Sequence, residues 1–135
     1  MSQAETLKQW AYHYIQSKDA IFKKIKSIED TEYGYLIKYQ DSDKKVLIKP
    51  VLDMSNDADS NIYTYNTMDN FYFLLSNWDY FVNLKAQICF VNPNSFLEKK
   101  WLVNPYVHDR ICERSALKRG LTSLFQTVDI YKPKP

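Results

Sequence analysis

A candidate nucleophile and a candidate base stand close together near the C-terminal end of the sequence. His108 and Cys112 are four residues apart, so one helical turn would place them on the same face, with Asp109 adjacent. Nucleophilic catalysis also needs a third group aimed at the imidazole, and an immediate sequence neighbour rarely has that geometry. We therefore interpret Cys112 as a small buried residue and His108 as a capping or surface residue. His13 is likewise interpreted as an ordinary histidine of a helix surface or core, so the sequence predicts no catalytic residue.

The motif Asp57-x-Asp59-x-Asn61 matches the first three ligand positions of a calcium-binding loop. The sixth position of such a loop needs glycine and here holds Ile62, and the twelfth needs a bidentate glutamate and here holds Met68. We therefore interpret this stretch as a solvated connection rich in turn-forming residues, and predict no metal and no cofactor. Weak binding of a hard cation by its carboxylates stays open at this stage.

Charge is distributed unevenly along the chain. Segment 51–84 has five aspartates and neither lysine nor arginine, whereas the residues from Phe96 onward include eight basic and four acidic side chains. Arg110, Arg114 and Lys118 recur every four residues, so a continuous helix would align them. This spacing favours either an ordinary solvated helix face or a basic patch that contacts phosphates. The candidate patch comprises Lys99, Lys100, Arg110, Arg114, Lys118 and Arg119.

Tyrosine is unusually frequent, with eleven residues in the chain. Alternation places three of them on one face of a predicted strand and two more on another strand. Because a tyrosine ring is large and apolar while its hydroxyl is polar, tyrosine is common at protein interfaces. AT-rich coding bias would produce the same excess without any function, so both interpretations stay open. The candidate aromatic binding surface comprises Tyr33, Tyr35, Tyr39, Tyr63 and Tyr65.

Apolar periodicity indicates which elements would carry these residues. The predicted order is a helix, a meander of two or three antiparallel strands, a further strand, a helix, two strands and a helix. Asp53–Asn61 is the longest loop, and Thr67 is a suitable N-cap for the central helix. The predicted helices are about Ala4–Ser17, Phe71–Val82 and one capped by Ser115 with an apolar face reaching Val128, after a helical turn at Arg110–Arg114; the predicted strands are Tyr33–Gln40, Val46–Val51, Ile62–Asn66, Leu84–Val91 and Lys100–Asn104.

Three shorter features allow less definite expectations. Ile21–Ile28 fits an extension of the first helix or a strand, and we favour a strand because Lys18-Asp19 interrupts the apolar stripe. Gly120 lies inside the last helix, where we expect close packing against a neighbouring element to explain it. We expect the tail, Tyr131–Pro135, to be extended and frayed.

Together these elements predict a single α+β domain over residues 1–135. It has a mixed, mostly antiparallel sheet, amphipathic helices at the N- and C-terminal ends and one central helix. This order of elements resembles that of the PD-(D/E)xK nucleases, whose third strand carries an acid-x-Lys motif with a metal-binding carboxylate. The corresponding residues here are Leu47-Ile48-Lys49, so an apolar side chain stands at the metal-ligand position. The resemblance covers element order alone and implies at most a degenerate nuclease scaffold.

Composition narrows the functional classes further. The 135 residues have a formal net charge of +2, and only two glycines, which excludes glycine-rich phosphate-binding loops. The two cysteines have no metal-ligand spacing, no segment is apolar enough to span a bilayer, and the N-terminal residues lack the apolar core of a signal peptide. We therefore expect a cytoplasmic protein without a membrane partner. The leading hypothesis is a non-enzymatic protein-interaction or accessory module that binds another protein or itself; the alternative is a nucleic-acid-binding protein on a degenerate nuclease-like scaffold.

Overall fold

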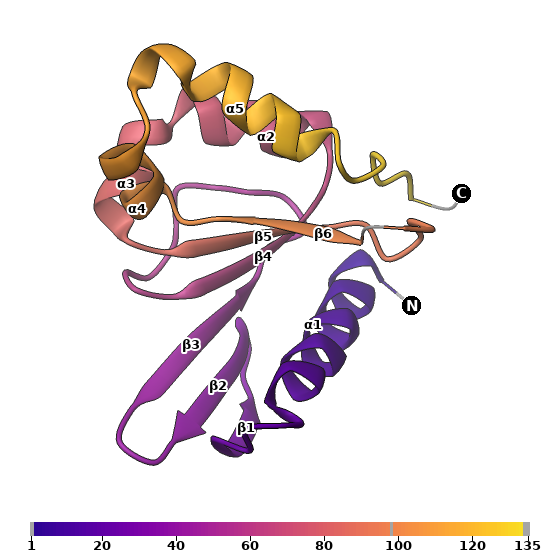
Figure 1. Cartoon of the computed structure of the whole chain (residues 1–135). Helices are drawn as coiled ribbons and strands as arrows, with labels where there is room; N and C mark the ends of the chain where they lie inside the picture. The colour runs from indigo at the N-terminus through magenta and orange to yellow at the C-terminus, as the bar shows by residue number, and fades with distance from the viewer. Residues whose placement is uncertain (1, 98, 134–135) are drawn as a thin grey trace.

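The computed structural model describes residues 2–97 and 99–133, which form one six-stranded sheet with helices on both faces (Figure 1). The long helix α1 covers one face, and α2, α3 and α5 form a layer on the other (Figure 1). The order of elements follows the prediction, except that two shorter helices replace the single central helix and a further helix precedes the last one. The helices are α1 (Gln3–Asp19), α2 (Met68–Ser76), α3 (Trp78–Leu84), α4 (Pro105–Ile111), the 3-10 turn η1 (Arg114–Ala116) and α5 (Leu117–Phe125); the strands are β1 (Ile25–Asp30), β2 (Gly34–Tyr39), β3 (Asp43–Ile48), β4 (Asn61–Tyr65), β5 (Gln87–Val91) and β6 (Lys100–Val103).

The strands lie in sequence order across the sheet, from β1 to β6. The pairs β1–β2, β2–β3 and β5–β6 are antiparallel, whereas β3–β4 and β4–β5 are parallel. The sheet is therefore mixed and mostly antiparallel, as predicted. Helices α2 and α3 connect the parallel strands β4 and β5, which is the usual way to join parallel neighbours. Strand β3 reaches its parallel neighbour β4 through loop 49–60 alone.

The N-terminal helix and the first strand are separated by a loop that the sequence analysis placed in the strand. Helix α1 ends at Asp19 and β1 begins only at Ile25. The predicted strand at Ile21–Ile28 is therefore confirmed in its second half, while Ile21 and Phe22 lie in the connecting loop. The side chain of Asp19 holds this loop, since its carboxylate oxygens accept hydrogen bonds from the backbone N–H groups of Lys24 (2.8 Å) and Ile25 (3.1 Å).

The central helix is interrupted in the middle. Helix α2 begins after its N-cap Thr67, whose hydroxyl accepts a hydrogen bond from the Asn70 N–H (3.2 Å), as predicted. Asn77 then leaves helical geometry, with φ −121° and ψ 31°, before α3 begins. The prediction of one unbroken helix over 71–82 is wrong, and two helices occupy that stretch. The apolar stripe continues across the break because Trp78 and Phe81 remain buried.

The C-terminal helices differ from their predicted boundaries. Helix α4 begins at Pro105, so the helical turn predicted at Arg110–Arg114 lies too late in the chain. Ser115 lies within η1 and does not cap α5. A Cβ built on Gly120 would meet no atom within 4 Å, so the close packing expected there is absent.

The tail is docked rather than frayed as far as it is described. The Tyr131 N–H donates a hydrogen bond to the Asn66 carbonyl (2.8 Å), and its ring stacks on Tyr65 with centroids 3.9 Å apart. Residues 134 and 135 of the predicted tail lie outside the described residues. This docking carries the C-terminal segment across the ends of β4 and β5.

Two separate clusters of buried residues lie on the two sides of the sheet. On the side of α1, which we call the tyrosine face, the cluster comprises Leu7, Ala11, Ile15, Tyr35, Ile37, Val46, Tyr63, Tyr65, Cys89, Val91 and Tyr131. On the side of α2, α3 and α5, the phenylalanine face, the largest rings are Phe71, Trp78, Phe81, Phe90, Trp101 and Phe125. Because successive residues of a strand point to opposite faces, β5 contributes Cys89 and Val91 to one cluster and Ile88 and Phe90 to the other.

Candidate functional site

The candidate catalytic residues do not form a triad. Asp109 accepts hydrogen bonds from the Trp78 indole N–H (3.0 Å) and from Arg114 Nε (2.5 Å). Both bonds hold the pKa of the Asp109 carboxyl below its usual value, and the bond from Arg114 has the larger effect. The His108 ring makes an edge contact with Trp78 instead, at 5.7 Å between centroids. Cys112 is exposed, which corrects its interpretation as a buried residue.

Cys89 is the buried cysteine of the pair. Burial raises the pKa of its thiol to about 12, so the thiol stays protonated at neutral pH. A protonated thiol within the tyrosine face is a packing group and not a nucleophile. The prediction that Cys112 packs inside the core is wrong, and Cys89, for which no burial was predicted, is the buried cysteine.

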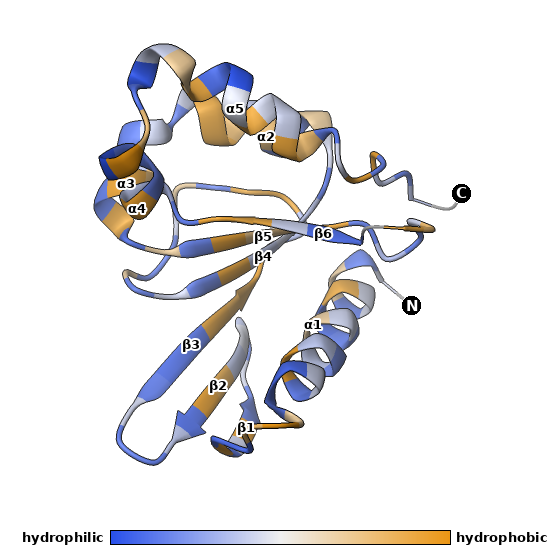
Figure 2. Ribbon diagram, in the orientation of Figure 1, coloured by the Kyte–Doolittle hydropathy of each residue, from blue (hydrophilic) through white to orange (hydrophobic). Residues whose placement is uncertain are grey.

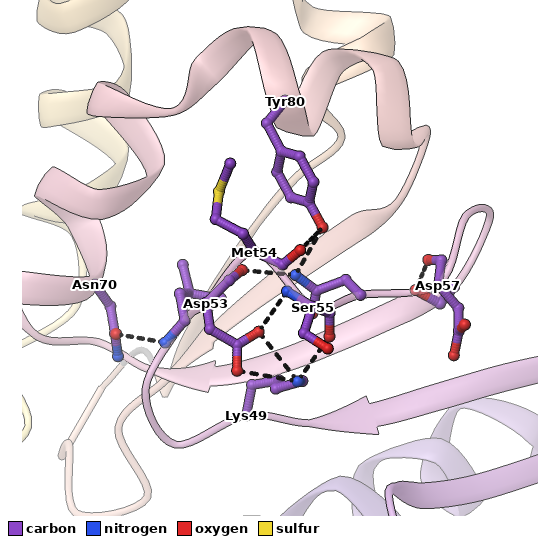
Figure 3. A network of polar contacts seen from close by, with 10 residues as sticks. Lys49, Asp53, Met54, Ser55, Asp57, Asn70 and Tyr80 are labelled. Atoms are coloured by element: carbon purple, nitrogen blue, oxygen red, sulfur yellow. Dashed lines mark hydrogen bonds and ion pairs between the residues drawn. The ribbon is translucent and has the colours of Figure 1, made fainter.

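The carboxylates of Asp53 and Asp57 engage different lysines and do not converge (Figure 3). Lys49 Nζ contacts both carboxylate oxygens of Asp53, at 3.1 and 3.2 Å, and donates to the Ser55 carbonyl at 2.8 Å. Asp57 pairs with Lys45 at 3.2 Å, on neighbouring strand β3. Figure 3 also shows the loop tied to α3 through the Tyr80 hydroxyl, which donates to the Met54 carbonyl (2.8 Å). Within residues 2–97 and 99–133, no cluster of three or more His, Cys, Asp or Glu side chains could hold a metal.

The six predicted basic residues are not brought onto one surface. Helix α4 ends before Arg114 and α5 begins after it, so no continuous helix aligns the predicted row. Arg114 is engaged by two carboxylates, with Nη2 at 2.7 Å from Asp79 in addition to its bond with Asp109. Lys100 Nζ lies over the Tyr14 ring of α1, on the tyrosine face, whereas Lys118 belongs to α5 on the opposite side of the sheet.

The remaining members of the predicted basic patch are also dispersed. Arg110 lies over the Tyr106 ring of its own helix, with 4.2 Å from Cζ to the ring centroid. Arg119 follows Lys118 on α5 and is exposed, while Lys99 directly precedes β6 in the β5–β6 loop. Within the described residues, the six basic side chains are therefore spread over α4, η1, α5 and the β5–β6 hairpin, and no continuous helix aligns them.

The five predicted tyrosines do not form an exposed surface. Tyr35, Tyr63 and Tyr65 are buried beneath α1, and Tyr39 is half-buried beside them. Only Tyr33 is exposed, and Lys45 Nζ lies 5.1 Å from its ring centroid. Alternation placed Tyr35 with Tyr39 and Tyr63 with Tyr65, and these four rings belong to the face that packs against the amphipathic helix α1, whereas Tyr33 precedes β2 and lies outside the cluster. The expected tyrosine-lined exterior is therefore corrected to a tyrosine-rich core.

A groove opens on the phenylalanine side of the molecule. It measures about 730 Å³ and lies between α2, α5 and the C-terminal segment 126–132; we call it the α2–α5 groove. Phe71 and Phe125 stack at its base, with centroids 4.5 Å apart and ring planes 7° apart. A groove of this size falls in the range of pockets that hold ligands or ligand side chains. Its lining residues are Met68, Phe71, Tyr72, Lys118, Thr122, Phe125, Gln126, Val128, Asp129, Ile130 and Lys132.

The third wall of the groove is irregular backbone held by two buried amides. Asn66 Nδ2 donates to the carbonyls of Val128 (3.0 Å) and Asp129 (3.2 Å), and Asn92 Nδ2 donates to the same Asp129 carbonyl (2.8 Å). The Asn66 Oδ1 in turn accepts from the Trp101 indole N–H (2.7 Å). Because these amides follow β4 and β5 directly, the carboxyl ends of two parallel strands position the wall. A wall fixed in this way is preorganised for binding.

The mouth of the groove combines exposed apolar side chains with cations. Met68 is 37% exposed, Tyr72 49% and Ile130 43%, although all three are large and mainly apolar. The ion pairs of the described chain include neither Lys118 nor Lys132. Asp129 is the one acidic residue in the lining. The arrangement suits a partner that inserts an apolar group and presents negative charge beside it.

Comparison with known proteins supplies no family for this chain. A scan against protein-family models, a search of curated proteins and a search of solved structures each returned no significant match. Among the described helices, none combines the length and apolarity needed to cross a bilayer. Leu47, at the position of the nuclease acidic residue, is buried in the core. Functional inference therefore rests on the geometry of the groove and of the exposed loops.

Of the groove residues, only Lys118 was a sequence-predicted site residue. Met68 and Tyr72 flank the apolar stripe of α2, and their outward positions were the available signal. The C-terminal wall was missed because helical spacing continues to Val128 in the sequence, whereas α5 ends at Phe125. The anchors of this wall are distant in the sequence, as the Asn92–Asp129 hydrogen bond shows.

Proposed function

We propose that this protein is a non-catalytic interaction module that binds an acidic segment of a partner protein in the α2–α5 groove. The observation that carries the proposal is the apolar base of Phe71 and Phe125 beneath two lysines outside the ion pairs of the described chain. An apolar side chain would fill the base, and carboxylates beside it would pair with Lys118 and Lys132.

The residue types at the mouth favour a protein partner. Methionine adapts its shape to irregular surfaces, and tyrosine presents a large ring at low entropic cost, so both are enriched at interfaces. The groove is open to solvent along α2 and α5, which suits a chain segment lying across it. Its preorganised wall reduces the ordering cost on binding.

A display selection tests the proposal directly. Random peptides are selected against the purified protein, and the affinity of the enriched peptides is measured by isothermal titration calorimetry. We expect a consensus of one large apolar residue next to Asp or Glu. The double variant Lys118→Glu, Lys132→Glu should weaken binding by about tenfold or more, because it places like charges opposite each other.

A matched control distinguishes an effect of charge at the groove from an effect of the overall charge of the protein on peptide binding. The variant Lys23→Glu, Lys24→Glu makes the same change of charge in the loop between α1 and β1, at the other end of the molecule (Figure 1). Peptide binding that is retained in Lys23→Glu, Lys24→Glu but weakened in Lys118→Glu, Lys132→Glu supports the groove as the binding site. Peptides without an acidic bias, or equal affinity for both variants, would contradict the proposal, and salt-sensitive capture of nucleic acid would favour the alternative function.

A further inference from the structure

We propose that the loop between α1 and β1 is an attachment point for an anionic lipid surface, independent of the α2–α5 groove. The loop carries two adjacent large apolar residues in water, Ile21 at 85% and Phe22 at 71% exposure. Figure 2 shows this connection as an apolar stretch at the lower end of the molecule, on the far side of the sheet from α2 and α5. An exposed apolar pair is available for contact with a partner, and the charges around it indicate of what kind.

The loop is held in its exposed conformation by its own hydrogen bonds. The Asp19 carboxylate accepts from the N–H groups of Lys24 and Ile25, and the Lys23 N–H donates to the Asp19 carbonyl (2.8 Å). Lys23 adopts a left-handed backbone conformation with φ 50°, which a non-glycine residue adopts only where its surroundings hold it there. Ile21 and Phe22 are exposed between these hydrogen-bonded residues.

Positive charge surrounds the apolar pair. Lys18, Lys23, Lys24 and Lys26 lie within nine residues of sequence, and none belongs to the ion pairs of the described chain. Asp19 is the acidic residue among them, and its carboxylate is occupied by backbone N–H groups. Anionic headgroups attract lysines near a membrane surface, while apolar side chains enter the boundary between headgroups and acyl chains.

A hollow beside the loop offers room for a headgroup. It measures about 640 Å³ and lies between the loop and the β2–β3 turn, with Lys23, Lys24, Lys26, Tyr39 and Asp41 in its lining. With three lysines and one aspartate in its lining, the hollow has a net positive charge. Phe22 lines the same hollow, so apolar contact and charge contact occur at one place.

The shape of the feature favours lipid over a protein or nucleic-acid partner. A convex apolar pair would require a matching pocket in a protein, whereas a lipid interface deforms around it. A nucleic acid offers phosphates to the lysines but no apolar environment for Ile21. We expected no membrane partner because no segment of the sequence can span a bilayer, but contact with a lipid surface needs no such segment.

Co-sedimentation with vesicles tests the inference. The full chain is mixed with phosphatidylcholine vesicles that contain or lack phosphatidylserine, and the bound fraction is measured at low and high salt. We expect binding only to the anionic vesicles, with a loss on raising the salt concentration. The variants Ile21→Ser, Phe22→Ser and Lys23→Glu, Lys24→Glu should each lower the vesicle partition constant by about tenfold or more.

A second exposed apolar pair supplies the matched control. Phe96 and Leu97, in the β5–β6 loop, are 91% and 83% exposed. The variant Phe96→Ser, Leu97→Ser should bind vesicles as the unmodified protein does. An equal loss in both serine variants would show unspecific adsorption and overturn the inference, as would binding to neutral vesicles alone. Retention of a single-stranded oligonucleotide that is insensitive to Ile21→Ser, Phe22→Ser would assign the lysines to nucleic acid instead and also overturn it.

Discussion

The two faces of the sheet are covered by chemically different layers. On the tyrosine face, hydroxyls at the edge of the core donate to the backbone of α1, from Tyr65 to Gln3 (2.6 Å) and from Tyr35 to Lys8 (3.2 Å). On the phenylalanine face, rings stack without hydroxyls, as Phe90 does on Trp101 with centroids 4.3 Å apart. The first face holds its cover by packing and by tyrosine hydrogen bonds to the backbone of α1. On the second face, the indole N–H groups of Trp78 and Trp101 donate to the side chains of Asp109 (3.0 Å) and Asn66 (2.7 Å).

This difference explains where the groove occurs. A single long helix with a straight apolar stripe closes the tyrosine face, and the hydroxyls hold it in register. The phenylalanine face is covered by shorter helices with a break at Asn77 and a non-helical segment after α5. Short elements meet at angles and leave a gap between them, which is the α2–α5 groove. The tyrosines therefore organise the core, while the recognition surface that we propose lies on the opposite side.

The largest effect is expected for a truncation on the phenylalanine face. Phe81 is fully buried and its ring contacts Phe73 and Tyr80. The substitution Phe81→Ala removes this packing and leaves a cavity, so we expect the free energy of unfolding to fall by about 3–5 kcal/mol in urea denaturation. The control Phe96→Ala, at an exposed site, should change stability by about 0.5 kcal/mol or less. Equal effects at both sites would contradict the burial described for α3.

The sequence predicted which residues share a face of the sheet better than it predicted which elements pack on that face. Alternation of Tyr35 and Ile37 along β2 identifies a common face, because strand periodicity is local. Helix α1 covers that face through contacts with strands far along the chain, which local patterns do not encode. The break at Asn77 went unpredicted because its apolar neighbours keep helical spacing across it, although asparagine is a poor helix former. The docking of Tyr131 on Tyr65 likewise depends on long-range packing.

The tyrosine face should make the fold sensitive to alkali. Burial raises the pKa of Tyr14 to about 12 and that of the Cys89 thiol to about 12, and raises the pKa of Tyr63 further. Because folded-state pKa values exceed the unfolded values of 10.0 and 9.0, this stabilisation is complete below pH 9.0 and is lost as pH rises toward 12. Urea denaturation across this range should show a falling free energy of unfolding, and Tyr63→Phe should reduce the fall. If the free energy of unfolding fell equally steeply with pH in Tyr63→Phe and in the unmodified protein, the Tyr63 phenol would not contribute to the alkaline loss of stability.

A smaller effect is expected for one hydroxyl of this face. Tyr65→Phe removes the hydrogen bond to the Gln3 carbonyl while keeping the ring stacked on Tyr131. The free energy of unfolding at neutral pH should fall by about 0.5–1.5 kcal/mol. Tyr63→Phe is the matched control, because the hydrogen bonds from tyrosine hydroxyls to α1 come from Tyr65 and Tyr35 within the described residues. If the two variants were equally stable, the hydroxyl of Tyr65 would not hold α1.

The smallest effect, and the only gain, is expected on the side of the phenylalanine face. Gly120 lies in α5 with open space around its missing Cβ, so Gly120→Ala should raise the free energy of unfolding by about 0.5–1 kcal/mol by reducing the entropy of the unfolded chain. The same substitution at Gly34 has the opposite sign. Gly34 sits in β2 at φ 152°, and a Cβ there would lie 2.2 Å from the Val46 carbonyl oxygen. Thermal unfolding of the two variants would compare the loosely packed helix with the closely packed strand, and a loss of stability in Gly120→Ala would mean that α5 is more tightly enclosed than its surroundings indicate.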